Sequence, residues 1–151
     1  MSWSKDSSLV LSQASTRIVM ALGALLAVAL PFLCMGDFFI GRAFIATENI
    51  LYLMPVYYAF CIPAYTALFA LDRLLAAVKR SEVFTAQNVR YLRIISWACI
   101  AAAIVLLISS FISITFFALA ILATFFGIIL RVVKNLFAAA VVLKTENELT
   151  I

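Results

Sequence analysis

The sequence has no histidine, and charged residues make up only 12% of its 151 residues. Its three cysteines, Cys34, Cys61 and Cys99, are each isolated in an apolar run, without a Cys-x-x-Cys pair. These absences leave structural zinc, haem held by histidine and histidine acid–base catalysis without support. The cysteines are typical of small, polarizable core residues, with palmitoylation or redox chemistry as the alternatives. We therefore expect no cofactor and no metal.

The scarcity of charge also argues against a soluble domain, in which about 25% of residues are charged. Instead, 67% of the residues are hydrophobic. They form continuous runs that are long enough to cross a bilayer as helix, which takes about 20 residues, and they do not alternate as barrel strands do. The sequence predicts an all-α polytopic membrane protein, a four-transmembrane-helix bundle with helical cytoplasmic extensions and one domain over residues 1–151.

The expected spans are separated by polar or turn-forming stretches. They cover about 18–40, 50–78, 89–109 and 114–143, after a loose or interfacial arm at 1–16 and with a cytoplasmic loop at about 79–88. The uncharged stretch Ile94–Leu130 is about twice as long as one span, so the hydroxyl-rich Ser109–Thr115 must hold a reversal. Thr85 is suited to cap the third helix, with Phe84 packed onto Val89.

Polar residues and glycines within the spans are few. Tyr65 lies deep and needs a hydrogen-bond partner in the bundle, whereas Tyr52, Tyr57 and Tyr58 are expected in an interfacial belt. Gly23 and Gly127 allow close contacts between helices. No span has a charge at its centre, where transporters and proton pumps usually need one. Nothing resembles a nucleophile with its base, a metal set or a phosphate loop, so we expect no enzymatic activity.

The basic residues are distributed very unequally between the two sides of the membrane. Four spans place both termini on one side, and that side holds every basic residue except Arg42. The set comprises Lys5, Arg17, Arg73, Lys79, Arg80, Arg90, Arg93, Arg131, Lys134 and Lys144. The positive-inside rule then predicts that the N- and C-termini are cytoplasmic.

Two candidate sites lie on this basic side. The polar stretch Arg80–Arg93 either fixes topology against anionic headgroups or offers a docking surface to a cytoplasmic protein. The residues singled out for partner or lipid contact are Arg80, Phe84, Asn88, Arg90, Arg93 and Lys134. Asp72 is a candidate for an inter-helix ion pair with Arg131 or Lys134, although each side chain can instead reach the headgroups separately. Beyond Arg131 the last helix is amphipathic, able to pack on the second span or in a partner's groove.

Two stretches of the chain carry a resemblance to a known family. They are LDRLLAAVKRSEVFTAQNVRYLRIISW and FGIILRVVKNLFAAAVVLKTENELTI, with the pattern Leu-Asp-Arg, then Glu-x-Phe-Thr-x-x-Asn, then a final Glu-Asn-x-Leu-Thr-Ile. Over about Thr16–Ile151 the chain resembles small bacterial membrane proteins catalogued as domain of unknown function 2975. The resemblance implies four spans in a bacterial inner (plasma) membrane and no established enzymatic activity. Members are often encoded beside a small helix-turn-helix regulator of the Cro/C1 type, which implies a membrane partner for a transcription factor.

These features favour a non-enzymatic integral membrane protein with a regulatory or scaffold role. Its expected partners are the lipid bilayer and a cytoplasmic protein such as a helix-turn-helix transcription regulator. Direct nucleic-acid binding is not expected, because no soluble module exists to support it, and a homo-oligomer is left open. The alternative is a small transport, channel-like or immunity component, with a holin-like pore as a third option. Transport would need a polar path through the bundle or an oligomer around such a path.

Overall fold

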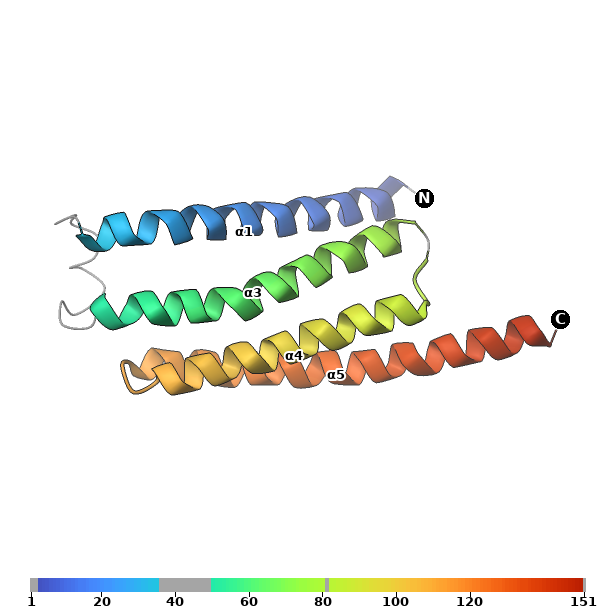
Figure 1. Cartoon of the computed structure of the whole chain (residues 1–151). Helices are drawn as coiled ribbons and strands as arrows, with labels where there is room; N and C mark the ends of the chain where they lie inside the picture. The colour runs from blue at the N-terminus through green and yellow to red at the C-terminus, as the bar shows by residue number, and fades with distance from the viewer. Residues whose placement is uncertain (1–2, 36–49, 81, 151) are drawn as a thin grey trace.

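The computed structural model describes residues 3–35, 50–80 and 82–150. In these ranges the chain forms four α-helices and no strand. They are α1 (Trp3–Met35), α3 (Ile50–Lys79), α4 (Ala86–Ser109) and α5 (Ile114–Leu149). Successive helices run in opposite directions, so the start of α1, the α3–α4 connection and the end of α5 lie at one end of the molecule (Figure 1). The all-α four-helix bundle expected from the sequence is confirmed.

All four helices are long and apolar enough to cross a membrane. The candidate spans are Ser7–Phe32, Tyr52–Lys79, Ala86–Ser109 and Ile114–Leu149. Large apolar side chains such as Phe32 and Ile62 are exposed on the outside of the bundle. Such a surface is stable only against lipid, because large exposed apolar patches are rare on soluble monomers. The chain is therefore a multi-pass membrane protein in contact with the bilayer.

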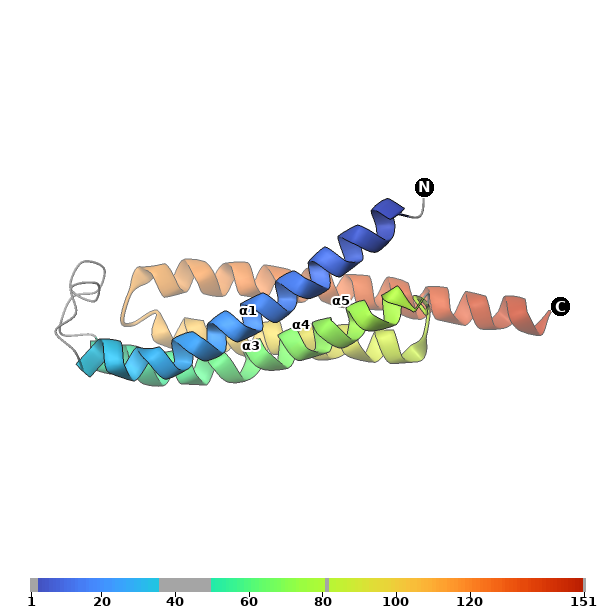
Figure 2. The same cartoon turned by 90° about the horizontal axis from the view of Figure 1, so that it is seen from above.

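The helices pack mainly on their neighbours in the sequence, α1 on α3, α3 on α4 and α4 on α5. In Figure 1, α3 lies between α1 and α4, and α5 runs along α4; α1 crosses α3 obliquely in the perpendicular view (Figure 2). Because α4 is covered from both sides, it supplies much of the core, including Leu92, Ile95, Ala98, Ala102 and Leu106. On α5, only Ala120 and Gly127 are buried.

The helix boundaries on either side of α4 follow from local capping. Thr85 has an extended backbone, and its side chain accepts a hydrogen bond from the N–H of Asn88, as expected for an N-cap. α4 ends at Ser109, and Ser113 caps α5 by accepting from the N–H of Thr115. The predicted reversal between the third and fourth spans is therefore confirmed.

Of the two alternatives expected for the N-terminal arm, loose or interfacial, the structure contradicts the first. Residues from Trp3 onward belong to α1, and the hydroxyl of Thr16 donates to the carbonyl of Ser12 one turn earlier (2.9 Å). The physical reason is that extending an existing helix avoids the cost of nucleation, so polar residues can continue it. The candidate span Ser7–Phe32 includes residues 18–32 of the expected span, and residues 36–40 lie outside the described part of the chain.

α3 contains two prolines within the helix. Pro55 lies in its second turn and Pro63 near its middle, and Figure 1 shows that α3 changes direction in its middle part. Proline removes one backbone hydrogen bond and displaces the preceding turn, which accounts for the bend. Pro63 is buried, so the bend is directed by packing within the bundle.

Candidate functional site

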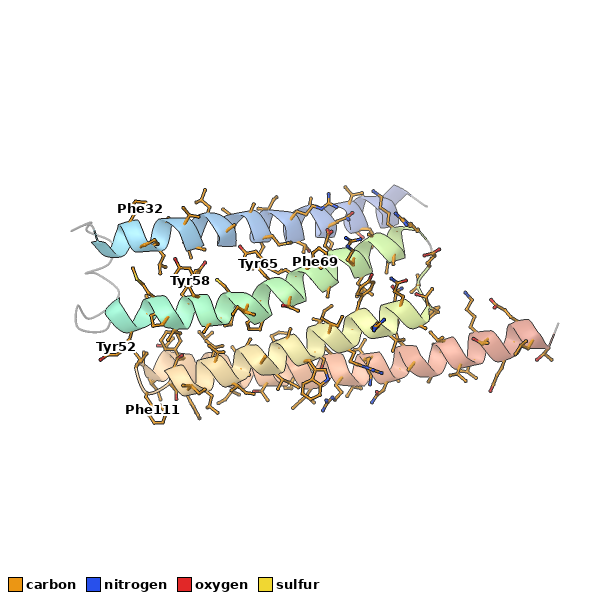
Figure 3. The ribbon with its side chains drawn as sticks, viewed as in Figure 1. Phe32, Tyr52, Tyr58, Tyr65, Phe69 and Phe111 are labelled. Atoms are coloured by element: carbon orange, nitrogen blue, oxygen red, sulfur yellow. The ribbon has the colours of Figure 1, made fainter. Side chains whose placement is uncertain are left out.

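The contact between α1 and α3 is made by three tyrosine hydroxyls that donate to backbone carbonyls of α1. Tyr57 donates to Gly23 (3.0 Å), Tyr58 to Ala27 (2.8 Å) and Tyr65 to Met20 (2.9 Å). Figure 3 shows Tyr58 and Tyr65 reaching from α3 toward α1. A helical carbonyl keeps a second lone pair, and a hydroxyl in lipid has no water to bond, so both groups are satisfied together. The expected partner for Tyr65 is confirmed, whereas Tyr57 and Tyr58 join helices rather than only forming a belt.

Asp72 is bound by α1 at the end of the molecule that holds both termini. The Nε atom of Arg17 lies 3.1 Å from its Oδ1 atom, within hydrogen-bonding distance, with the Arg17 side chain 65% and the Asp72 side chain 20% exposed. The guanidinium of Arg131 instead lies 5.0 Å from the ring centroid of Trp97 on α4. The described residues contain no Asp72–Arg131 or Asp72–Lys134 ion pair. The physical reason is topological: α3 packs on α1 and α4, while α5 packs mainly on α4.

The connection between α3 and α4 is organised by Asn88. This residue is 0% exposed, and its side-chain amide donates to the carbonyls of Glu82 (2.6 Å) and Val83 (2.8 Å). Because both acceptors are carbonyls, the orientation of the amide is fixed, and its Oδ1 atom has no partner in the described part of the chain. Asn88 was singled out for surface contact, but a fully buried side chain holds the connection together and presents nothing to a partner.

Phe84 joins this connection to the C-terminal part of α5. Its ring centroid lies 5.6 Å from that of Phe137, while the side chain remains 45% exposed. The sequence indicated that the amphipathic end of the last helix packs on the second span. The ring contact places Phe137, on this end of α5, against the loop that follows that span. A half-exposed aromatic pair of this kind is a common feature of binding surfaces.

The remaining basic residues lie on different faces. Arg80, at the end of α3, is exposed, as are Arg90 and Arg93 on α4, and Lys134 on α5 is half-buried. The structure therefore brings Phe84 together with Phe137, and Arg93 into the same hollow as Trp97. It does not gather all the singled-out residues into one site. Sequence reasoning did not predict the ring contacts of Trp97 and Phe137. For Trp97, its place four positions after Arg93 was a usable signal.

A large apolar groove of about 770 Å³ lies between the four helices. Its wall includes Leu26, Phe60, Leu106 and Phe126, one from each helix, and none of the described residues that line it is charged. Among the described residues no cluster of three cysteine, aspartate or glutamate side chains is placed to hold a metal. Cys61 and Cys99 are free thiols; the side chain of Cys34 lies outside the described set.

The helices and their exposed apolar surface define the class, a four-span helical membrane protein with a basic end. A scan of family models gives a match over residues 12–151 to the family described as "Protein of unknown function (DUF2975)". The chain belongs to this family, which confirms the resemblance found in its motifs. No curated protein and no solved structure matches it.

Proposed function

We propose that this chain is a non-enzymatic regulatory or scaffold protein of a bacterial plasma membrane, with both termini in the cytoplasm. Its C-terminal extension on α5, defined as residues Lys134–Leu149, would bind a cytoplasmic protein. The helix-turn-helix regulator that the family resemblance implies is the first candidate. The extension leaves the bundle as a single helix beyond the other helices (Figures 1 and 2).

The observation that carries the proposal is exposed apolar surface on this extension. A helix of 36 residues is about 54 Å long, and the hydrocarbon core of a bilayer takes up about 30 Å of it. Leu136 and Leu143 are 64% and 66% exposed on the remaining part. Exposing leucine side chains to water to this extent costs free energy, and contiguous apolar patches usually mark an interface.

The spacing of these side chains supports a partner with an apolar groove. Val132, Leu136, Ala139 and Leu143 recur at intervals of three or four residues, so they share one face of the helix. Amphipathic helices with anchors at this spacing bind by laying that face into a groove. Phe84 and Phe137 lie at the base of the extension and would widen the contact.

The test is co-purification of a helix-turn-helix regulator of the Cro/C1 type from the same bacterium with membranes that contain the full chain. We expect the double variant Leu136→Glu/Leu143→Glu to lose the regulator, because two carboxylates would have to be buried in an apolar groove. The matched control is Thr145→Glu/Asn147→Glu, which adds the same charge to exposed positions of the same helix without removing a leucine.

Two outcomes would count against a cytoplasmic partner. The first is equal recovery of the regulator with both double variants. The second is a purified protein whose own oligomeric state, measured by light scattering, falls in the leucine variant alone. That result would assign the face to a second copy of this chain.

The orientation is tested separately by cysteine labelling. In a variant without native cysteines, Phe111→Cys places a thiol at a position that is 95% exposed in the turn between α4 and α5. An impermeant maleimide should label this thiol in intact cells, whereas Thr150→Cys should react only after permeabilisation. The reverse pattern would place the extension outside the cell and remove the proposed partner.

The alternative function, a small transport, channel-like or immunity component, ranks second. The large groove between the helices is lined by apolar side chains, which offer an ion or a polar solute no replacement for its hydration shell. Flux measurements on proteoliposomes separate the two functions. Solute release that depends on the protein and is blocked by Ala123→Phe, a substitution in the groove wall, would favour transport.

A further inference from the structure

Two adjoining hollows lie on the outer face of α4 and differ in character. The first, of about 850 Å³, is formed by the start of α4 and is lined by polar groups that include Gln87, Arg90 and Arg93. The second, of about 430 Å³, lies between α3 and α4 and is mainly apolar, with Ile62 and Trp97 in its wall. Arg93 and Ile94 line both hollows, so the two lie side by side along α4.

The order of the hollows along α4 matches the polarity of a membrane leaflet. Arg90 lies four residues after the start of α4, about 6 Å along its axis. Ala101, in the wall of the apolar hollow, lies about 22 Å along it. The polar hollow is therefore at the end that bears the basic residues, and the apolar hollow extends toward the bilayer centre.

The arginines of the polar hollow have charges that nothing nearby neutralises. Arg90 and Arg93 are exposed, and neither forms an ion pair or hydrogen bond with another residue in the described ranges. Arg131 approaches from α5, where its guanidinium lies against the ring of Trp97. Two guanidinium groups without a carboxylate partner, those of Arg90 and Arg93, thus line the polar hollow, and that of Arg93 also lines the apolar one.

We propose that the two adjoining hollows bind one anionic phospholipid. Its phosphate lies between Arg90 and Arg93, because guanidinium forks match phosphate oxygens. An acyl chain lies in the apolar hollow against Ile62, Ile94 and Trp97. The same phosphate chemistry occurs in soluble phosphate esters, but only a lipid uses both hollows at once. This inference does not depend on the proposed cytoplasmic partner.

Trp97 provides a direct readout of the site. The chain has two tryptophans, so Trp3→Phe leaves Trp97 as the only one. In nanodiscs, lipids with brominated acyl chains quench this fluorescence when a chain reaches the hollow. We expect brominated phosphatidylglycerol to quench at a lower mole fraction than brominated phosphatidylcholine. Arg93→Gln removes a charge-assisted hydrogen bond to the phosphate, so it should reduce the preference by roughly tenfold.

Matched variants separate a site from general charge attraction. Arg80→Gln removes the same charge at the same end but outside both hollows, and should keep the preference. Arg93→Lys should retain most of it. Equal quenching by the two lipids in the Trp3→Phe protein would overturn the proposal, as would an equal loss with Arg80→Gln. Competition by free glycerol 3-phosphate at millimolar concentration would also overturn it, because it would identify a soluble ligand instead.

Discussion

The hydroxyl of Ser96 donates a 2.8 Å hydrogen bond to the carbonyl of Gly127, across the interface between α4 and α5. Both residues are buried, and Gly127 lies where the two helices approach closely. A Cβ atom at Gly127 would lie 3.1 Å from Cγ1 of Ile100 and 3.4 Å from Cβ of Cys99. In lipid there is no hydrophobic drive between helices, so association depends on such close packing and on hydrogen bonds.

Gly127→Val should therefore weaken the α4–α5 hairpin. The added side chain overpacks the interface, and we expect a loss of about 1–3 kcal/mol in the free energy of unfolding. Ser96→Ala should cost less, about 0.6 kcal/mol, the average for a hydrogen bond between membrane helices. Thermal unfolding in detergent measures both. Ser15→Ala on the exposed face of α1 is the control, and a destabilisation by Gly127→Val no larger than that control would contradict the close approach.

Gly23 and Tyr65 should be energetically coupled. A Cβ atom at Gly23 would lie 2.9 Å from the Tyr65 hydroxyl oxygen, which is closer than real contacts allow. Gly23→Ala should destabilise the α1–α3 contact, and Tyr65→Phe should do so by losing its hydrogen bond to Met20. In the double variant the clash disappears, so we expect its destabilisation to be smaller than the sum of the two. Additive losses in thermal unfolding would show that the two residues act independently.

Charge exchange at Asp72 distinguishes its two possible partners. Asp72→Arg should lower the amount of folded protein in the membrane, because it places two arginines side by side. Arg17→Asp/Asp72→Arg should restore that amount, while Asp72→Arg/Arg131→Asp should not. The Arg17 side chain is largely exposed, so the pair should contribute no more than about 1 kcal/mol. Fluorescence size-exclusion chromatography measures the folded fraction, and rescue by the Arg131 exchange alone would argue against the contact with Arg17.

Asn88→Ala should loosen the α3–α4 connection. Two side-chain hydrogen bonds to the carbonyls of Glu82 and Val83 are lost. At about 0.5–1.5 kcal/mol each, they should lower the free energy of unfolding by about 1–3 kcal/mol. Limited proteolysis of the 80–85 connection should become faster. Gln87→Ala, which removes only the contact with the Tyr91 hydroxyl at the surface, is the control. Equal proteolysis rates for both variants would contradict the structural role of Asn88.

Much of the fold was predictable because it follows from local chemistry. The length of the apolar runs predicts the number of spans, and the hydroxyl-rich stretch is the one place where the uncharged Ile94–Leu130 could reverse. Thr85 and Ser113 cap the starts of α4 and α5. The same reasoning did not predict the helix at residues 3–16, where a polar composition had suggested a loose arm as one alternative. It also assigned Asn88 to the surface, because composition does not reveal which polar side chain is turned inward.

The candidate site was predictable only in part. Charge density directed attention to Arg80–Arg93, and amphipathic spacing to the end of α5. Which residues meet depends on the order in which the helices pack. This order places Asp72 in an ion pair with Arg17, Arg131 over the ring of Trp97, and Phe84 against Phe137. These are contacts between residues far apart in the chain, for which neither spacing nor propensity carries information.

The sequence alone determined that this is a four-span helical membrane protein with its basic residues gathered at one end, since hydropathy and charge act on each segment separately. Only the tertiary structure decided that tyrosine hydroxyls join α1 to α3, that the Ser96 hydroxyl donates to the Gly127 carbonyl, and that two hollows adjoin at Arg93. The reason is physical. Lipid accepts any apolar helix face almost equally, so helix pairing depends on a few small residues and hydrogen bonds whose partners become neighbours only in the folded bundle.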